Sequence, residues 1–303
     1  MSLRVERIPL PLPWGGTVYP TVIDSPSVRL LIDSGHTAAP SRQALVSALS
    51  ARPPDVLLLT HAHQDHYGGL PALRERYPNL LVYAAECARP YYEDQERTVL
   101  THRDRLERFA HRAGLTGDLL EQVLSGYEVI AQSGCTAELE RGLVDGDELE
   151  FGEVVVRVHH HPGHHHHHLV FELPELSTVV TGDNVFETNL TPPQVRFDDD
   201  GLRVATLPTL LDSLERLADL GGRGLPSHGP ELADVSVTAR RAHAAYRRTA
   251  QRVTRAWAQF ETPPSLPDLM EAVFGEVPLP FVGLRLGFLL GYVDWVGLGE
   301  HYR

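Results

Sequence analysis

Four side chains that bind metals lie within six residues of one another in the segment HAHQDH, residues 61–66. The segment directly follows DVLLLT (55–60), an apolar run that predicts a buried β-strand. In a tight loop after a strand, His61 and His63 can turn to one side and share one metal ion, while Asp65 and His66 face a second. Imidazole nitrogens and carboxylate oxygens are typical zinc ligands, and catalytic zinc sites keep one position open for water. The segment therefore predicts a catalytic metal site at the end of a strand.

Three further short motifs place candidate ligands after strands or turns. PGH puts His164 after the apolar run VVVRV, TGD puts Asp183 after STVV, and SHGP puts His228 where the alternating strands and helices end. Active-site loops gather at strand ends in α/β folds. We therefore expect these residues to meet the HAHQDH segment in space.

The elements that must position these motifs alternate between strand and helix. Apolar runs and helical patterns follow one another at 28–35 (strand), 41–50 (helix), 55–60 (strand), 70–77 (helix) and 80–86 (strand). Ser41 is the expected N-cap of the first helix. Short strands return from residue 143, and leucines at helical spacing predict a helix over 205–220. This alternation predicts a layered α/β domain.

Two segments depart from the alternation. Residues 86–128 are charged, nearly balanced in sign and helical in pattern. They form either a solvated helical excursion or a cap over a pocket, which Tyr91 and Tyr92 would then line, since long excursions in compact domains are often lids. Residues 233–303 predict a small, mainly helical C-terminal unit that begins with a long helix. We therefore expect two domains, 1–232 and 233–303.

Composition narrows the function classes. A formal net charge of −13 argues against a general binder of polyanions. All 27 basic residues are arginines, so chemistry that needs a Schiff-base lysine or a P-loop lysine is excluded. The two cysteines give no disulfide framework, and the N-terminus shows no signal-peptide pattern. The most apolar stretch, 278–297, is interrupted by Arg285 and Asp294 and predicts packed core. We expect a cytoplasmic protein with no membrane partner.

The four motifs, in this order, resemble those of the metallo-β-lactamase-fold hydrolase superfamily, in which HxHxDH, PGH, (S/T)GD and GHGP supply the ligands of a dinuclear metal centre. The resemblance covers about residues 5–232. The sequence departs from the pattern at Ser227, which replaces the usual glycine of GHGP, and in the histidines around PGH. The resemblance implies an αββα sandwich. The C-terminal unit is similar in length and pattern to the winged-helix-like unit of the lactamase-β2-like group.

Carried over by position, the resemblance implies a complete set of metal ligands. His61, His63 and His164 would bind the first metal, Asp65, His66 and His228 the second, and Asp183 would bridge the two. The ligand types suit two zinc ions, with iron or manganese as alternatives. Two metals that share a water lower its pKa toward roughly 7 and yield a bridging hydroxide as the nucleophile. Asp65 and Asp183 would act as catalytic residues that orient this hydroxide and take up its proton.

Two further residues are expected to support the ligands from behind. The run LLIDSG matches the family strand that carries a structural aspartate, here Asp33, expected to hydrogen-bond the HAHQDH loop. An ordinary aspartate in a strand-end turn fits the sequence equally well. His168 stands where related sequences carry a second histidine, as in PGHTPGH. The other histidines of the run 159–168 are expected to be bystanders or to lie at a pocket rim: His159, His160, His161, His165, His166 and His167.

The leading functional hypothesis is hydrolysis of a small ester, a thioester as in the glyoxalase II-like group, or a lactone. It predicts a small-molecule partner, no nucleic acid, and allows a homodimer. The alternative is a metal-dependent ribonuclease of the lactamase-β2-like group. That reading depends on 240–255, which holds six arginines and no acidic residue and could hold phosphates along a helix. A third class, a non-catalytic binding module, is disfavoured by the intact set of ligands.

Overall fold

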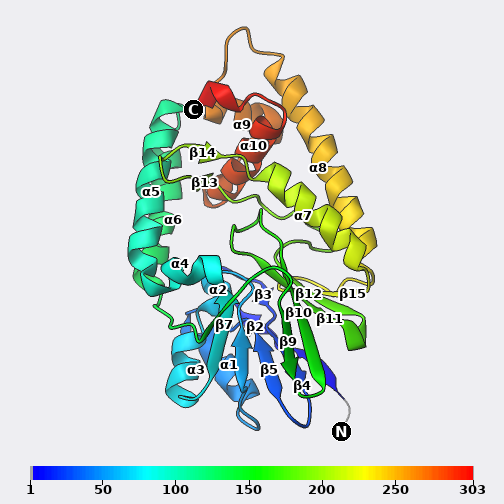
Figure 1. Cartoon of the computed structure of the whole chain (residues 1–303). Coiled ribbons are helices and arrows are strands. Elements are labelled where there is room, and N and C mark those ends of the chain that lie inside the picture. Colours follow the sequence, from blue (N-terminus) through cyan, green and yellow to red (C-terminus); the bar gives the residue numbers. More distant parts are fainter. Residues whose placement is uncertain (1–2, 303) are drawn as a thin grey trace.

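Two β-sheets packed against each other form the centre of the computed structural model, which describes residues 3–302 (Figure 1). The first sheet has the strand order β1 (Arg4–Arg7), β4 (Thr21–Asp24), β5 (Arg29–Ile32), β6 (Val56–Leu58), β7 (Leu81–Ala85) and β8 (Arg141–Leu143). The second has the order β15 (Arg223–Pro226), β12 (Thr178–Gly182), β11 (Leu169–Leu173), β10 (Val154–His160) and β9 (Glu148–Phe151). Two small antiparallel pairs complete the strands: β2 (Leu10–Pro11) with β3 (Thr17–Val18), and β13 (Arg196–Phe197) with β14 (Arg203–Val204).

The burial pattern of the strands explains the layers. All residues of β5 and β6 are buried, as expected for strands covered on both faces. In β11, Phe171 packs in the core between the sheets, whereas its neighbour Val170 faces the opposite side, toward the helices. Successive side chains of a strand point to opposite faces, so the second sheet has one face toward its partner sheet and one toward helices.

Helices cover the outer face of each sheet. The first sheet carries α1 (Ala39–Ala48) and α3 (Leu70–Arg76), with the short α2 (Gln64–Tyr67) between β6 and α3. The second sheet carries α7 (Leu207–Leu220), whose leucines pack with Val170. The architecture is the expected αββα sandwich. The N-cap of α1 is not Ser41 but Ala38, because Pro40 fits the first turn, and the Ser41 hydroxyl accepts instead from the His36 amide at 3.1 Å.

The charged segment after β7 folds into a helical arm. It contains the turn η1 (Glu86–Ala88) and the helices α4 (Arg89–Glu93), α5 (Gln95–Arg112) and α6 (Gly117–Ser133). The arm rises from the first sheet on one side of the molecule, in the cyan and teal part of Figure 1. Its last helix ends at Ser133, five residues beyond the expected end of the insertion at 128.

The C-terminal part is helical. It contains α8 (Val235–Trp257), α9 (Leu266–Phe274), η3 (Leu279–Phe281), α10 (Val282–Trp295) and η4 (Gly299–Tyr302). Within 233–302 no strand occurs, so the similarity to a winged-helix unit extends to helices and not to a β-hairpin wing. Apolar residues of α8, α9 and α10 share one core with those of α5, α6 and α7. The domain boundary at 232 therefore stays a prediction.

Among residues 3–302, no single helix has the length and apolarity that a membrane span requires. The helix α9 and the segment Leu279–Trp295 reach that threshold only as a pair, which is bent by 101°.

Candidate metal centre and its cavity

Four strand ends bring the predicted ligands together. The HAHQDH segment follows β6, the PGH turn follows β10, Asp183 follows β12, and His228 lies two residues after β15. These strands belong to both sheets, so the site lies at one end of the sandwich, where loops of the two sheets meet.

His61, His63 and His164 form the first ligand group. The Nε2 atom of His61 lies 2.9 Å from Nδ1 of His63, and Nε2 of His164 lies 3.1 Å from the same atom. One ligand atom from each of the three side chains lies close enough to the others to share one metal ion. Three neutral imidazoles are a ligand set that could hold one metal ion.

Asp65, His66 and His228 form the second ligand group. His228 Nε2 lies 3.2 Å from Asp65 Oδ2, and His66 Nε2 lies 3.7 Å from Asp65 Oδ1. Asp183 stands between the groups, because its Oδ2 lies 3.5 Å from Nε2 of both His66 and His228 and 3.6 Å from Nε2 of His164. The structure thus brings the seven predicted ligands together, with Asp183 between the two groups.

The donor atoms of this cluster fit metal ions. In three of the imidazoles, Nδ1 lies within hydrogen-bond distance of an oxygen acceptor. The acceptor is Asp33 Oδ2 for His66, at 2.7 Å. It is the backbone oxygen of Pro192 for His164, at 3.1 Å, and that of Thr17 for His228, at 3.2 Å. A donating Nδ1–H leaves the lone pair of Nε2 free to bind a metal. Buried His66 Nε2 and Asp183 Oδ1 have no hydrogen-bond partner. Such orphaned polar atoms are costly unless a ligand satisfies them.

The imidazoles of the first group are held neutral. Burial lowers the pKa of His61 well below its usual value, and the neighbouring imidazoles of His66 and His63 lower it further. Burial and the adjacent His164 lower the pKa of His63 to about 3. Burial also lowers the pKa of His164. Neutral imidazole is the form that binds metals, so this group needs no deprotonation at neutral pH.

The second group has the opposite electrostatics. Burial alone would lower the pKa of His66, but the carboxylates of Asp183, Asp65 and Asp33 raise it well above its usual value. At His228, burial also lowers the pKa, but the carboxylates of Asp183 and Asp65 outweigh this effect and raise the pKa to about 10. Burial disfavours the charged forms of Asp65 and Asp183, yet the two imidazoles lower both pKa values. A metal ion bound by this group would take the place of these protons as the partner of the carboxylates.

Asp33 lies directly behind the HAHQDH loop. Its Oδ1 accepts the Thr60 amide at 2.8 Å, and its Oδ2 accepts from His66 Nδ1. Its backbone adopts φ +63°, a left-handed conformation that aspartate tolerates better than most residues. The contacts are those of a residue that fixes the ring of His66 and the start of the loop.

His168 supports the bridging aspartate. Its Nε2 accepts the Asp183 amide at 3.0 Å, and its Nδ1 lies 2.8 Å from the Asn184 side-chain nitrogen. Gly182 permits this contact, since it adopts φ +53° and a Cβ there would lie 2.6 Å from His168 Nε2. The glycine of TGD is therefore required both by its conformation and by the ring beside it.

The Pro-Gly turn before His164 is held against α7. Gly163 adopts φ +134°, and a Cβ there would lie 2.5 Å from Leu210 Cα. The Ser213 hydroxyl donates to Pro162 O at 2.7 Å. Packing of the turn against α7 thus fixes the position of His164 in the cluster.

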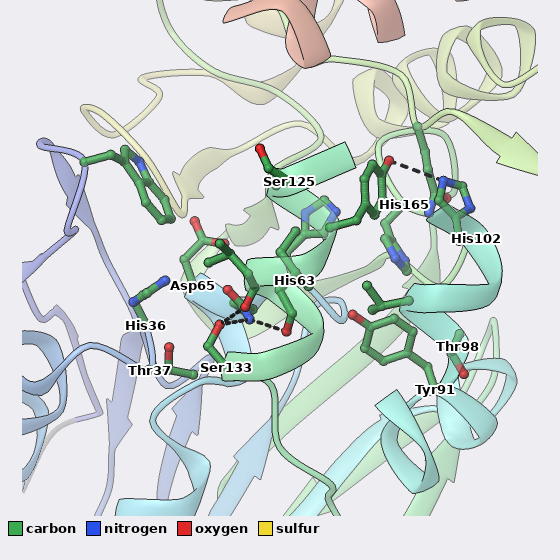
Figure 2. A pocket seen from close by; sticks show the side chains of 18 of the residues that line it. His36, Thr37, His63, Asp65, Tyr91, Thr98, His102, Ser125, Ser133 and His165 are labelled. Carbon is green, nitrogen blue, oxygen red and sulfur yellow. Dashed lines mark hydrogen bonds between the residues drawn. The ribbon is translucent and has the colours of Figure 1, made fainter. Parts of the chain in front are cut away.

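A cavity of about 740 Å³ opens on the metal cluster at His63 and Asp65. Its walls come from the arm helices α5 and α6, from the loop between β2 and β3, and from the segments around 36–38 and 194–195. Figure 2 shows His63 and Asp65 in the middle of this space, with His36 on one side and Tyr91 and His102 on the other. Of the two readings of 86–128, the structure favours a cap that walls a pocket.

The two candidate tyrosines of the cap differ. Tyr91 lines the cavity, whereas Tyr92 is fully buried in the core and packs on Tyr67 with ring centroids 5.4 Å apart. The expectation for Tyr92 was wrong, because its side chain leaves α4 about 100° away from that of Tyr91 and packs on Tyr67 in the core.

The remaining histidines of the run separate into three environments. His165 and His166 line the cavity, in agreement with a pocket-rim position. His161 and His167 are buried away from its wall. His159 and His160 belong to β10 and are half-buried at the surface, where His159 Nε2 lies 2.9 Å from Glu172 Oε2.

Sequence reasoning missed Gln64, which stands inside the HAHQDH segment. Its side-chain nitrogen donates to Ile130 O at 2.8 Å and to Ser133 Oγ at 2.7 Å, both on α6. It therefore ties the ligand loop to the cavity wall. Trp14, from the loop between β2 and β3, was also missed and lines the cavity. Gln64 occupies a variable position of HxHxDH and Trp14 lies outside all four motifs, so only the fold reveals their roles.

Known proteins agree with this geometry. The family model of the metallo-beta-lactamase superfamily matches residues 13–223. The lactamase-like protein adaB of Aspergillus niger is 25% identical over 270 residues, which cover 82% of this chain and 65% of that protein. The chain thus spans about two thirds of the length of this relative. A hydroxyacylglutathione hydrolase of Xylella fastidiosa is 39% identical over 79 residues, 26% of this chain and 30% of that enzyme.

Solved structures share the fold over nearly the whole chain. The metallo-beta-lactamase family protein TTHA1429 of Thermus thermophilus superposes with a TM-score of 0.78 at 23% identity, covering 97% of this chain and 94% of that one. A beta-lactamase domain protein of Burkholderia ambifaria superposes with a TM-score of 0.74 at 20% identity, covering 97% and 87%. TTHA1623, solved in a di-iron-bound form, has a TM-score of 0.50 at 28% identity over 77% of this chain and 96% of that one. With the family model matching more than half of its length, the chain belongs to the metallo-beta-lactamase superfamily.

Proposed function

We propose that this protein is a dinuclear zinc hydrolase that cleaves a small ester, thioester or lactone. One observation carries the proposal: six ligand side chains in two groups converge on Asp183, which lies within 3.6 Å of an imidazole of each group. The relatives named hydroxyacylglutathione hydrolase act, as their name states, on an acyl thioester of glutathione. This similarity supports a thioester among the substrates.

Each residue of the cluster has a task that its position explains. When bound, the metal ions would supply Lewis acidity and an activated water. His61, His63 and His164 would hold one ion, and Asp65, His66 and His228 the other. Asp183 would face both ions, with its Oδ1 free of protein partners to orient the attacking water.

The proton of that water needs a nearby acceptor. Asp65 and Asp183 are the carboxylates of the cluster, and in the absence of metal the imidazoles of His66 and His228 lower both pKa values. Asp65 also lines the cavity, so it reaches the space where a scissile carbonyl would lie. We assign these two residues the transfer of protons between the water and the leaving group.

The alternative of a ribonuclease receives less support from the arrangement of the arginines. The arginine-rich segment 240–255 lies within α8, and no residue of α8 lines the cavity. In Figure 1, α8 and the arm helices α5 and α6 lie on opposite sides of the molecule. The arginines of α8 that would bind RNA phosphates therefore do not line the cavity that opens on the cluster.

The test is a substrate panel on protein reconstituted with zinc, iron or manganese. We expect turnover of esters, thioesters or lactones that disappears on metal removal, and in an Asp183→Asn variant that still folds. Metal analysis should find about two ions per chain. A zinc-loaded protein inactive on the whole panel, yet active on single-stranded RNA, would replace the proposal by the ribonuclease.

A further inference from the structure

The wall of the cavity contains no cationic anchor. The sequence has no lysine, so a fixed positive charge could come only from arginine. Among residues 3–302, no arginine lines the cavity. Its one carboxylate within these residues is Asp65, a predicted metal ligand. Burial lowers the pKa of His102 to about 4, so this imidazole adds no positive charge at neutral pH.

The wall is instead rich in apolar side chains. Val99, Tyr127, Val129 and Ile130 contribute from α5 and α6, and Trp14 and Val195 from segments outside the arm. Two of them lie open to solvent, since Trp14 is 66% and Val129 62% exposed. Large apolar surfaces left exposed beside a cavity commonly mark a ligand-binding site.

From this wall we infer that the cavity binds the uncharged, apolar acyl group of the substrate, and that glutathione thioesters and nucleotide-bearing thioesters are not its preferred substrates. The inference rests on the proposed hydrolase function and names the substrate class. A glutathione conjugate brings two carboxylates and one ammonium group at neutral pH. Burying such charges without partners is costly, and the net charge of −13 opposes the approach of anions.

Size supports the same assignment. A cavity of about 740 Å³ is in the range that encloses a ligand of drug size. Since the cavity opens on His63 and Asp65, an acyl chain in contact with Val129 and Ile130 would share one space with the metal cluster. The polar side chains of the wall, such as Gln194 and Ser125, offer hydrogen bonds without charge.

The first experiment compares 4-nitrophenyl esters from acetate to octanoate with a hydroxyacyl thioester of glutathione, on the metal-loaded protein. We expect kcat/KM to rise about threefold per methylene while the chain fits the cavity, and the glutathione thioester to be the poorer substrate. Preferred turnover of the glutathione thioester would overturn the inference while leaving the proposed hydrolase function intact.

Two matched variants test the charge of the wall directly. Val129→Arg adds a cation at the cavity rim, and Val237→Arg adds the same cation on α8 at a residue 61% exposed and outside the cavity. We expect Val129→Arg to lower kcat/KM for the 4-nitrophenyl ester of octanoate and to raise kcat/KM for the glutathione thioester, each by roughly threefold to fivefold. Val237→Arg should change neither value. Equal behaviour of the two variants would contradict the inference.

A binding measurement separates this inference from catalysis. N-phenylnaphthylamine, an uncharged apolar fluorophore, should bind the wild-type protein and be displaced by octanoate ester analogues. Its affinity should fall in Val129→Arg and not in Val237→Arg. If no substrate is turned over but this pattern holds, the hydrolase proposal fails and the apolar character of the cavity stands. Absence of fluorophore binding overturns the inference whatever the activity.

Discussion

The Nδ1 of His66 lies 2.7 Å from Oδ2 of Asp33, so a residue of the HAHQDH segment is held by a strand-end aspartate 33 positions earlier in the chain. Asp33 also accepts the amide and the hydroxyl of Thr60, which precedes the segment. The orientation of the ligand loop thus depends on one buried carboxylate. Partners of this kind fix the ring and the tautomer of a metal-binding histidine.

Replacing Asp33 by Asn should weaken metal binding without unfolding the protein. Asn tolerates the left-handed backbone of residue 33 and can still accept the Thr60 amide, but its NH₂ group cannot accept from His66 Nδ1. We expect a loss of about 10- to 100-fold in affinity for one of the two ions. Competition with a chelator measures this, and Asp198→Asn, at a turn distant from the cluster, is the control. Unchanged affinity of both ions in Asp33→Asn would refute the role of Asp33.

Replacing Gly182 by Ala should damage the site more than a typical surface change. The new Cβ would lie 2.6 Å from His168 Nε2, in a backbone conformation with φ +53° that side chains rarely adopt. We expect a loss of about 1–3 kcal/mol in the free energy of unfolding, together with reduced metal content. Denaturant titration and metal analysis check both. The control is Gly146→Ala, where φ is also positive but no atom lies within 4 Å of the added Cβ. Equal effects of the two variants would show that strain alone, and not the His168 contact, matters.

Metal binding should release protons from one ligand group and not from the other. His66 and His228 have raised pKa values, about 10 for His228, so both carry a proton at pH 7 before metal binds. His61, His63 and His164 have lowered pKa values and are already neutral. Loading of both ions at pH 7 should therefore release about two protons, and the affinity of the His66–His228 position should rise as pH increases toward 10.

Calorimetry in buffers of different ionisation enthalpy counts the released protons at each binding step. The His61→Ala variant, which removes a ligand of the first group only, serves as the comparison because its remaining step should keep the proton release. Two binding steps that release equal numbers of protons would contradict the difference between the groups.

Replacing Gln64 by Ala should affect substrate binding more than metal binding. Gln64 is not a predicted ligand, but its side chain joins the ligand loop to α6 through Ile130 O and Ser133 Oγ. Loss of both hydrogen bonds loosens the wall of the cavity. We expect two metals still bound and KM raised roughly threefold to tenfold. Gln251→Ala, exposed on α8, should leave KM unchanged. A Gln64→Ala variant that loses metal would instead place Gln64 in the metal site.

The ligand set could be predicted from the sequence because its information is local. A buried strand followed by HAHQDH, PGH, TGD or SHGP fixes the side chains that emerge from each strand end, whatever the rest of the chain does. The alternation of apolar runs and helical patterns, which reflects burial on one or both faces of each element, predicted a layered α/β domain. The αββα order of the layers followed from the resemblance of the four motifs to the metallo-β-lactamase superfamily.

The tertiary structure decided what these loops face. Tyr91 and Tyr92 are adjacent in sequence, yet one lines the cavity and the other lies in the core against Tyr67. Which residues line the cavity is likewise visible only in the fold, and within residues 3–302 no arginine does so. The sequence by itself determined which residues can bind metal. Only contacts between distant segments decided the shape and charge of the space beside them, since such contacts depend on how whole elements pack and not on local spacing.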